Sequence, residues 1–180
     1  MNIKIESSRL LVRNFLLSDL SETIAHKEEP SFSKYIGEKP TPIEVKEQLA
    51  KDVQNWSAKV NEKLRLVIEL KSENKMVGIL MFKFVDTDKL IGEIGFSLSA
   101  DYMGKGLASE ATKLLIDFAF TEFNLLKIIA LCDIRNTASY GLMERLGMTK
   151  LSEQITYTDT TGKRDSFQYE LLRSDWFPVR

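Results

Sequence analysis

Two glycines in the stretch DYMGKGLASEA, Gly104 and Gly106, stand where a predicted strand gives way to a predicted helix. Because glycine has no side chain, a ligand can approach the backbone N–H groups closely, and the helix start adds the positive end of its dipole. The first free N–H donors of that helix belong to Leu107, Ala108 and Ser109. The pattern predicts a site for an anion such as a pyrophosphate, and an ordinary tight turn is the competing interpretation.

Two further polar residues, Asn136 and Ser139, open another predicted helix. An asparagine at this place caps a helix by accepting a hydrogen bond from a backbone N–H of the first turn, and the serine would then face water. On spacing alone, the pair predicts a helix start.

Hydrophobic periodicity predicts the elements that position these residues. The predicted strands are 9–15, 65–70, 76–86, 90–99, 127–134, 148–157 and 165–172. The predicted helices run from Asp19 to about Glu28, from Thr41 to about Val60, from the glycine turn to near Phe123, and up to Gly147, with 30–42 as a loop. The first four strands suit an antiparallel meander, whereas the unbroken apolar run 127–134 is typical of a strand buried in a parallel pair. We therefore expect one α/β domain over 1–180, with a right-handed βαβ unit around the turn.

A dinucleotide-binding fold is the main rival for the glycine turn. Asp133 follows the next strand, where such a fold places the acid that holds a ribose. However, Ser109 stands where the third glycine is expected, and only one βαβ unit follows the turn.

The stretch from Gly92 to Thr149, with GEIGFSLSADYMGKGLASEA and DIRNTASYGLMERLGMT, resembles the core of GNAT acetyltransferases of the RimJ/RimL-like branch. The opening SSRLLVRNF and the pair Ser18-Asp19 resemble that branch too. One departure is Asp101, which stands where the family's pyrophosphate turn carries glutamine or arginine. The resemblance implies a GNAT fold, whose mixed, mainly antiparallel sheet has flanking helices and is splayed between the fourth and fifth strands, where the pantetheine arm inserts.

The resemblance also implies site residues. Acetyl-CoA would be the co-substrate, without a metal, and would bind at Phe96, Ser97, Leu98, Met103, Gly104, Lys105, Gly106, Leu107, Ala108, Ser109, Asn136 and Ser139. Asn136 would hold the pantetheine arm, and Ser139 would protonate the departing thiolate. Many family members place a tyrosine acid four residues after that serine, but here the position is Met143. Tyr140 is no obvious substitute, because adjacent helix residues point about 100° apart.

Glu93 is the candidate general base. Strand alternation places Ile91, Glu93, Gly95 and Ser97 on one face, and Gly92, Ile94, Phe96 and Leu98 on the other. A carboxylate there, or a water it orients, could take the proton from the attacking amine, while backbone N–H groups of 96–98 polarise the thioester carbonyl. The alternative is a partly solvated glutamate paired with a lysine or arginine.

The acceptor implied by the resemblance is the N-terminal α-amine of a protein or peptide. Alternatives are a small amine, such as a polyamine or an aminoglycoside-like compound, and a non-catalytic acyl-CoA-binding module. The segments 31–40 and 158–165 would flank the acceptor cleft in this fold.

Composition narrows the setting. The net charge is −1, which favours neither a nucleic-acid nor a membrane partner, and Cys132 is the single cysteine. The chain starts without a signal-peptide pattern, so we expect a cytoplasmic protein, acting as a monomer or homodimer. His26, the single histidine, lies among charged residues and is expected to be solvated, and Cys132 is expected to be a small buried residue.

Overall fold

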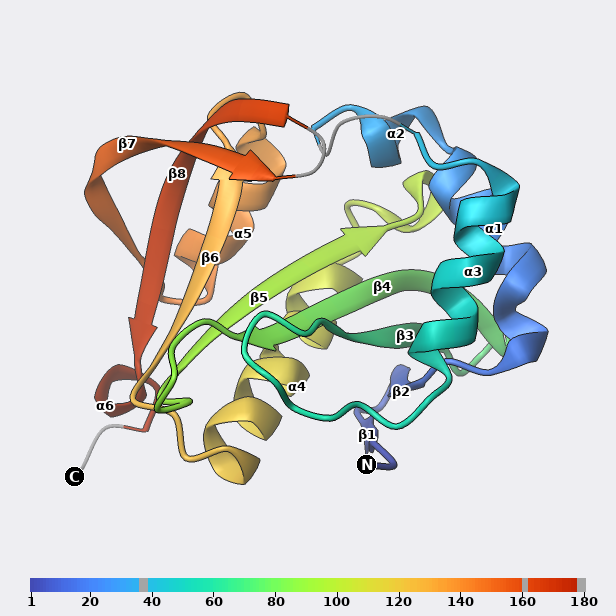
Figure 1. The fold of residues 1–180 in the computed structure, drawn as a ribbon, viewed down its shortest axis with the longest axis horizontal. Helices are drawn as coiled ribbons and strands as arrows, with labels where there is room; N and C mark the ends of the chain where they lie inside the picture. The colour runs from blue at the N-terminus through green and yellow to red at the C-terminus, as the bar shows by residue number, and fades with distance from the viewer. Residues whose placement is uncertain (36–38, 160–161, 178–180) are drawn as a thin grey trace.

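The computed structural model describes residues 1–35, 39–159 and 162–177, and gives the backbone alone at 152–154, 157–159 and 162–164. One eight-stranded sheet runs through these residues in the order β1-β2-β3-β4-β5-β6-β8-β7 (Figure 1). Its strands are β1 (Lys4–Glu6), β2 (Leu10–Asn14), β3 (Leu64–Leu70), β4 (Lys75–Phe84), β5 (Ile91–Leu98), β6 (Lys127–Asp133), β7 (Thr149–Asp159) and β8 (Gly162–Leu172). Only the β5–β6 pair among these strands is parallel, which confirms the predicted mixed, mainly antiparallel α/β sheet.

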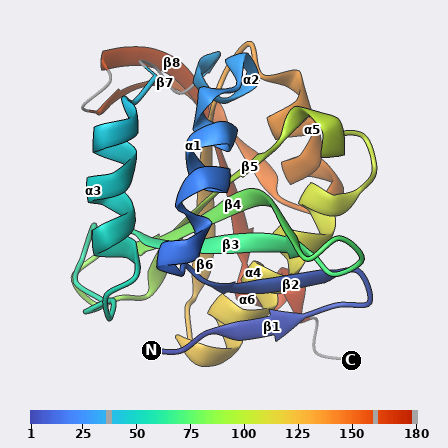
Figure 2. The ribbon, with the colours of Figure 1, turned by 90° about the vertical axis from the view of Figure 1, so that its right-hand side faces the viewer.

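Helices cover both faces of the sheet. They are α1 (Leu20–Glu28), α2 (Pro30–Ser33), α3 (Pro42–Asp52), α4 (Leu107–Glu122), α5 (Thr137–Arg145) and α6 (Arg173–Trp176), with 3-10 turns at Leu17–Asp19 and Ala100–Tyr102. Figure 2 shows α1 and α3 on one side of β3 and β4, and α4 on the other. The larger core includes Leu66, Leu80, Leu98, Leu115 and Phe120, whereas Phe15, Leu49, Val67, Met76 and Ile79 form a smaller core against α1 and α3.

The parallel pair is short, and this opens the sheet. β5 and β6 are paired from Ile91↔Lys127 to Ile94↔Ala130 only. Beyond that point β5 stays paired with β4 as far as Leu98, and β6 stays paired with β8 as far as Asp133. The two strands diverge visibly towards their C-terminal ends (Figure 1), which confirms the expected splay between the fourth and fifth predicted strands.

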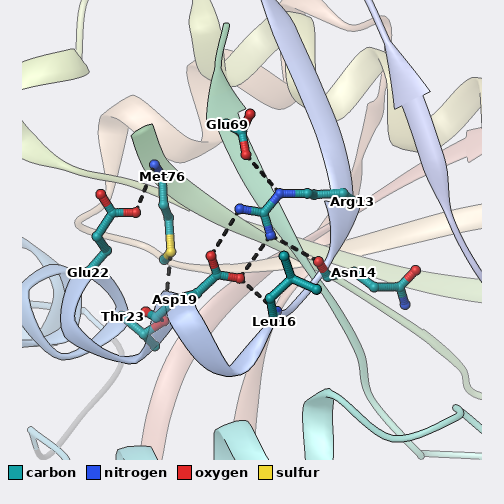
Figure 3. A network of polar contacts seen from close by, with 8 residues as sticks. All are labelled: Arg13, Asn14, Leu16, Asp19, Glu22, Thr23, Glu69 and Met76. Carbon is teal, nitrogen blue, oxygen red and sulfur yellow. Dashed lines mark hydrogen bonds and ion pairs between the residues drawn. The ribbon is translucent and has the colours of Figure 1, made fainter. Parts of the chain in front are cut away.

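A charged network fixes the start of α1 against the sheet (Figure 3). The guanidinium of Arg13 on β2 donates to both carboxylate oxygens of Asp19, at 2.8 and 2.9 Å, and to Glu69 on β3 at 2.7 Å. The pKa of Arg13 is raised, chiefly by its hydrogen bonds to Asp19. Asp19 also accepts from the Leu16 backbone N–H, so the chain turns into α1 around this carboxylate.

One predicted helix end and one predicted loop were wrong, and one strand was not predicted. The helix expected to reach Val60 ends at Asp52, because Trp56 turns away to pack on Phe82, Phe84 and Phe123, and Ala58 has a left-handed backbone. The segment expected to be a loop contains α2. β1 has three residues, too few for alternation to show. Among the described residues, no helix is long and apolar enough to cross a membrane.

Candidate active site

A cavity of about 420 Å³ lies beside the end of β5 that is no longer paired with β6. Three groups of residues form most of its wall: the end of β5, the glycine turn with the start of α4, and α5 with its cap. The lining residues in these groups are Phe96, Ser97, Leu98, Met103, Gly104, Gly106, Leu107, Ala108, Ser109, Asn136, Ala138, Ser139, Leu142 and Arg145. All residues predicted to bind the cofactor are therefore gathered here except Lys105, which does not line the cavity.

The glycine turn has the backbone that its sequence predicts. Gly104 and Gly106 have φ values of 74° and 77°, in the left-handed region that glycine tolerates, and Gly106 caps α4. Arg9 stabilises the turn, because its guanidinium donates hydrogen bonds to the Lys105 carbonyl at 3.1 Å and to the Glu110 carboxylate at 2.7 Å. A methyl group added at Gly104 would meet no atom within 4 Å, so this side of the turn is open. The turn can thus offer backbone N–H groups and a helix N-terminus to a pyrophosphate.

Asn136 caps its helix, as the spacing predicts, and it lies with Ser139 at the cavity. The Asn136 side chain accepts from the Ser139 N–H at 3.1 Å and caps α5, and both residues line the cavity. Close by, burial raises the pKa of the Cys132 thiol to about 11, although its hydrogen bond with Ser139 lowers it. Cys132 is buried, as predicted, and a thiol with this pKa is protonated at neutral pH.

Neither Met143, which stands at the position of the family's tyrosine acid, nor Tyr140 lines the cavity. Met143 is buried in the core, and Tyr140 packs edge-on against Phe167 with ring centroids 5.9 Å apart. Ser139 is therefore the hydroxyl of α5 that faces the cavity.

Glu93 lies in the sheet beneath the α1 and α3 face. It is 8% exposed, and its carboxylate forms an ion pair with Lys83 on β4 at 3.0 Å. The alternative of a lysine partner was therefore right, but both side chains are buried instead of partly solvated. Glu93 is not among the residues that line the cavity.

The expectation for His26 was wrong. Its side chain is 3% exposed, and its two ring nitrogens lie 2.8 Å from the Ser99 hydroxyl and 2.9 Å from the Ser97 hydroxyl. The pKa of His26 is lowered to about 4, chiefly by burial. Charged neighbours in the sequence suggested a solvated face, but α1 packs this position against β5, about seventy residues further along the chain.

The remaining wall comes from Ser31, Phe32 and Tyr35, in α2 and just after it. They belong to the segment 31–40 that was expected to flank the acceptor cleft, so their neighbourhood was predicted, although these residues were not singled out. The other expected segment, 158–165, lies outside the described side chains apart from Asp165. Sequence reasoning also missed Ala138, Leu142 and Arg145. Leu142 follows Ser139 by three residues and Arg145 follows Leu142 by three, a helical spacing that could have indicated both.

The cavity wall is poor in charge. Among the described residues that line it, none is an aspartate or glutamate, and Arg145 is the one with a permanent charge. Hydroxyl groups come from Ser31, Tyr35, Ser97, Ser109 and Ser139. In the described part of the chain, no three His, Cys, Asp or Glu side chains are grouped closely enough to hold a metal ion.

Comparison with known proteins identifies the architecture. The profile of the acetyltransferase (GNAT) domain matches residues 9–149. The uncharacterized N-acetyltransferase YnaD of Bacillus subtilis is 30% identical over 175 residues, which cover 96% of this chain and 98% of YnaD. A crystal structure of a GNAT-family acetyltransferase from Bacillus anthracis superposes with a TM-score of 0.81 at 29% identity, over 94% of this chain and 98% of that one.

A structure from the RimJ/RimL-like branch shares this fold. RimL, the ribosomal L7/L12 α-N-protein acetyltransferase solved in complex with coenzyme A, superposes with a TM-score of 0.81 over 96% of this chain and 99% of its own. The identity is 15%, so this likeness shows a shared fold. The dinucleotide alternative fails, because Asp133 is bound by its neighbour Arg135 at 2.6 and 2.8 Å and only one parallel pair is present among the described strands.

Proposed function

This chain belongs to the GNAT family of acetyl-CoA-dependent N-acetyltransferases, and we propose that its acceptor is the N-terminal α-amine of a protein or peptide. The observation that carries the proposal is that the described residues lining the cavity include no aspartate or glutamate and a single arginine. A polyamine carries several positive charges at pH 7, and its recognition calls for carboxylates. A single α-amine needs none, and its pKa of about 7.7–8.0 leaves roughly a tenth of it neutral at pH 7.

The transfer would be direct, within a ternary complex. Acetyl-CoA supplies the activated thioester, the turn at 104–109 holds its pyrophosphate, and backbone N–H groups of 96–98 polarise the carbonyl. The amine nitrogen attacks this carbon, the C–S bond breaks, and one proton passes overall from nitrogen to sulfur. Ser139 delivers the proton to sulfur, and Glu93, through water, takes the proton from nitrogen. Both roles are predictions from the resemblance.

A small amine is the second candidate. The spermidine N(1)-acetyltransferase of Escherichia coli is 31% identical over 85 residues, which cover 47% of this chain. The putative ribosomal N-acetyltransferase YdaF of Bacillus subtilis is 25% identical over 105 residues, or 58% of this chain. Neither match spans two thirds of the chain, so neither relative's acceptor carries over to this protein. An acetylation assay distinguishes the two candidates.

Release of CoA thiol in the presence of short peptides tests the proposal. Peptides with free N-terminal alanine, serine or methionine are expected to exceed spermidine at least tenfold in kcat/KM. The matched control is the same peptide with a blocked N-terminus and an internal lysine, which should stay unmodified. A preference for spermidine, or equal acetylation of the blocked peptide, would refute the N-terminal acceptor.

The proposed base needs its own control, because Glu93→Gln also leaves Lys83 unpaired. Lys83→Met breaks the same ion pair and keeps the carboxylate. If Glu93 is the base, Glu93→Gln lowers kcat much more than Lys83→Met, with similar losses of stability. Equal effects on kcat would reduce Glu93 to a structural partner of Lys83.

A further inference from the structure

A buried polar unit joins the end of α1 to the cavity wall. His26 lies between two hydroxyls of β5 and the residue after it, with Nε2 at 2.9 Å from Ser97 Oγ and Nδ1 at 2.8 Å from Ser99 Oγ. Ser97 lines the cavity, whereas Ser99 does not. The unit therefore connects the buried imidazole to one residue of the cavity wall, Ser97.

The same imidazole supports a second part of the wall. Phe32, which also lines the cavity, meets the His26 ring edge-on with centroids 5.4 Å apart. Glu29, between α1 and α2, accepts from the Ala100 N–H at 2.7 Å and from the Ser31 hydroxyl at 3.1 Å. The end of β5 and the α2 segment are thus held together on one side of the cavity.

His26 carries no charge at neutral pH. Burial lowers its pKa to about 4, while Glu29 partly opposes this by raising it. A neutral imidazole has one N–H and one lone pair. Consequently one serine accepts a hydrogen bond from the ring, and the other donates one to it.

We propose that the Ser97 hydroxyl accepts a hydrogen bond from the attacking amine. His26 positions this hydroxyl, because its Nε2 accepts a hydrogen bond from the Ser97 O–H. The chemical reason is the direction of the hydrogen bond. A nucleophilic nitrogen must keep its lone pair free for the carbonyl carbon, so a neighbouring hydroxyl can accept from its N–H but must not donate to it. With its own proton committed to His26, Ser97 turns its oxygen lone pairs to the cavity.

His26 is then a positioning residue and does not store the substrate proton. The C–N bond forms, the C–S bond breaks, and the proton balance described above is unchanged. The inference rests on acetyl transfer to an amine in this cavity, and it holds for a peptide α-amine or a small primary amine alike.

The tautomer of His26 provides a test that needs no acceptor. Because His26 is the single histidine of the chain, its two ring nitrogens give the only imidazole ¹⁵N signals. We expect the proton on Nδ1, donated to Ser99, with Nε2 unprotonated at pH 7. A proton on Nε2 would overturn the proposal, whatever the outcome of the peptide assay.

Kinetics of two serine variants provide the second test. The acceptor is either a peptide that begins with alanine or spermidine, whichever the wild type acetylates better. Ser97→Ala is expected to lower kcat/KM for the amine about tenfold, as loss of one hydrogen bond to the reacting group predicts. The KM for acetyl-CoA should be unchanged, because the backbone N–H of residue 97 is retained. Ser99→Ala, the matched control, removes the other hydroxyl on the same ring and should cost less than threefold. Equal losses in the two variants would show a structural role only.

Two replacements of His26 complete the test. The amide of His26→Gln reaches the place of Nε2 and can still accept from Ser97, whereas that of His26→Asn reaches only the place of Nδ1. Glutamine should therefore retain most of the amine kcat/KM, and asparagine should lose about as much as Ser97→Ala. The opposite order would contradict the positioning role.

Discussion

The two ends of α1 are fastened to the sheet by different chemistry. At its start, Arg13, Asp19 and Glu69 form a charged network whose members do not line the cavity. At its end, the neutral His26 is hydrogen-bonded to the hydroxyls of Ser97 and Ser99, and Ser97 lines the cavity. Asp19 and His26 are both nearly inaccessible, at 4% and 3% exposure.

This difference separates stability from function. Ion pairs hold their side chains firmly in place. A charge near the thioester, however, would change the energy of every charged species formed during the transfer. Neutral hydroxyls and backbone N–H groups can bind the reactants with little field of their own. We therefore expect changes at the charged end to alter stability alone, and changes at the cavity to alter binding or turnover.

The largest effect is expected from Arg13→Ala. It leaves the buried Asp19 carboxylate without its cation, which typically costs about 3–5 kcal/mol and lowers Tm by roughly 10 °C in a chain of this size. Acetyl-CoA affinity of the folded protein should be unchanged. Glu6→Gln, which breaks the exposed pair with Lys71, is the control and should shift Tm little. Similar Tm values for both variants would contradict the view that the buried charged network at the start of α1 carries stability.

Acid should lower the free energy of unfolding through His26, at the neutral end of α1. His26 has a pKa of about 4 when folded against 6.5 for the free side chain, so the unfolded chain binds the additional proton between these values. Stability is thus full above pH 6.5 and falls as pH decreases towards 4, by on the order of 3 kcal/mol. Urea unfolding at pH 7 and pH 4.5 measures the loss. His26→Gln cannot take up this proton and should lose less, and an equal loss would contradict the assignment.

Alanine substitutions at two left-handed glycines separate an effect on stability from an effect on acetyl-CoA binding. Gly104→Ala and Gly147→Ala place a methyl group at φ values of 74° and 81°, with no atom within 4 Å in either case. Each should cost about 1–2 kcal/mol of stability through backbone strain. Only Gly104→Ala should also raise the Kd for acetyl-CoA, about tenfold, because its methyl points to the expected pyrophosphate site. Isothermal titration calorimetry distinguishes them, and equal Kd values would move the pyrophosphate elsewhere.

The smallest effect concerns two helix caps. Thr41 caps α3 away from the cavity, and Asn136 caps α5 on its wall. Replacement of either by alanine should cost about 1 kcal/mol in thermal unfolding. Only Asn136→Ala should also weaken acetyl-CoA binding. If both variants bind acetyl-CoA like the wild type, Asn136 serves α5 alone.

Most elements of the fold could be predicted from the sequence, because each depends on a local pattern. Alternation and apolar runs located seven of the eight strands, and the left-handed glycines marked the turn that opens α4. The cap at Asn136 and the burial of Cys132 followed from spacing and residue type. The end of α3 could not be predicted, since the partners that draw Trp56 away lie on β4 and after α4.

The sequence by itself determined seven of the eight strands, the glycine turn and the helix cap at Asn136, because neighbouring residues specify each of these features. The set of residues expected at the cofactor came from the family resemblance. Only the tertiary structure decided that Glu93 is paired with Lys83 and that His26 is buried against Ser97 and Ser99. Those contacts depend on strand register and on the packing of α1 across the sheet. A charged sequence neighbourhood carries no information about a partner more than seventy residues away, so the chemistry of His26 emerges only in the folded chain.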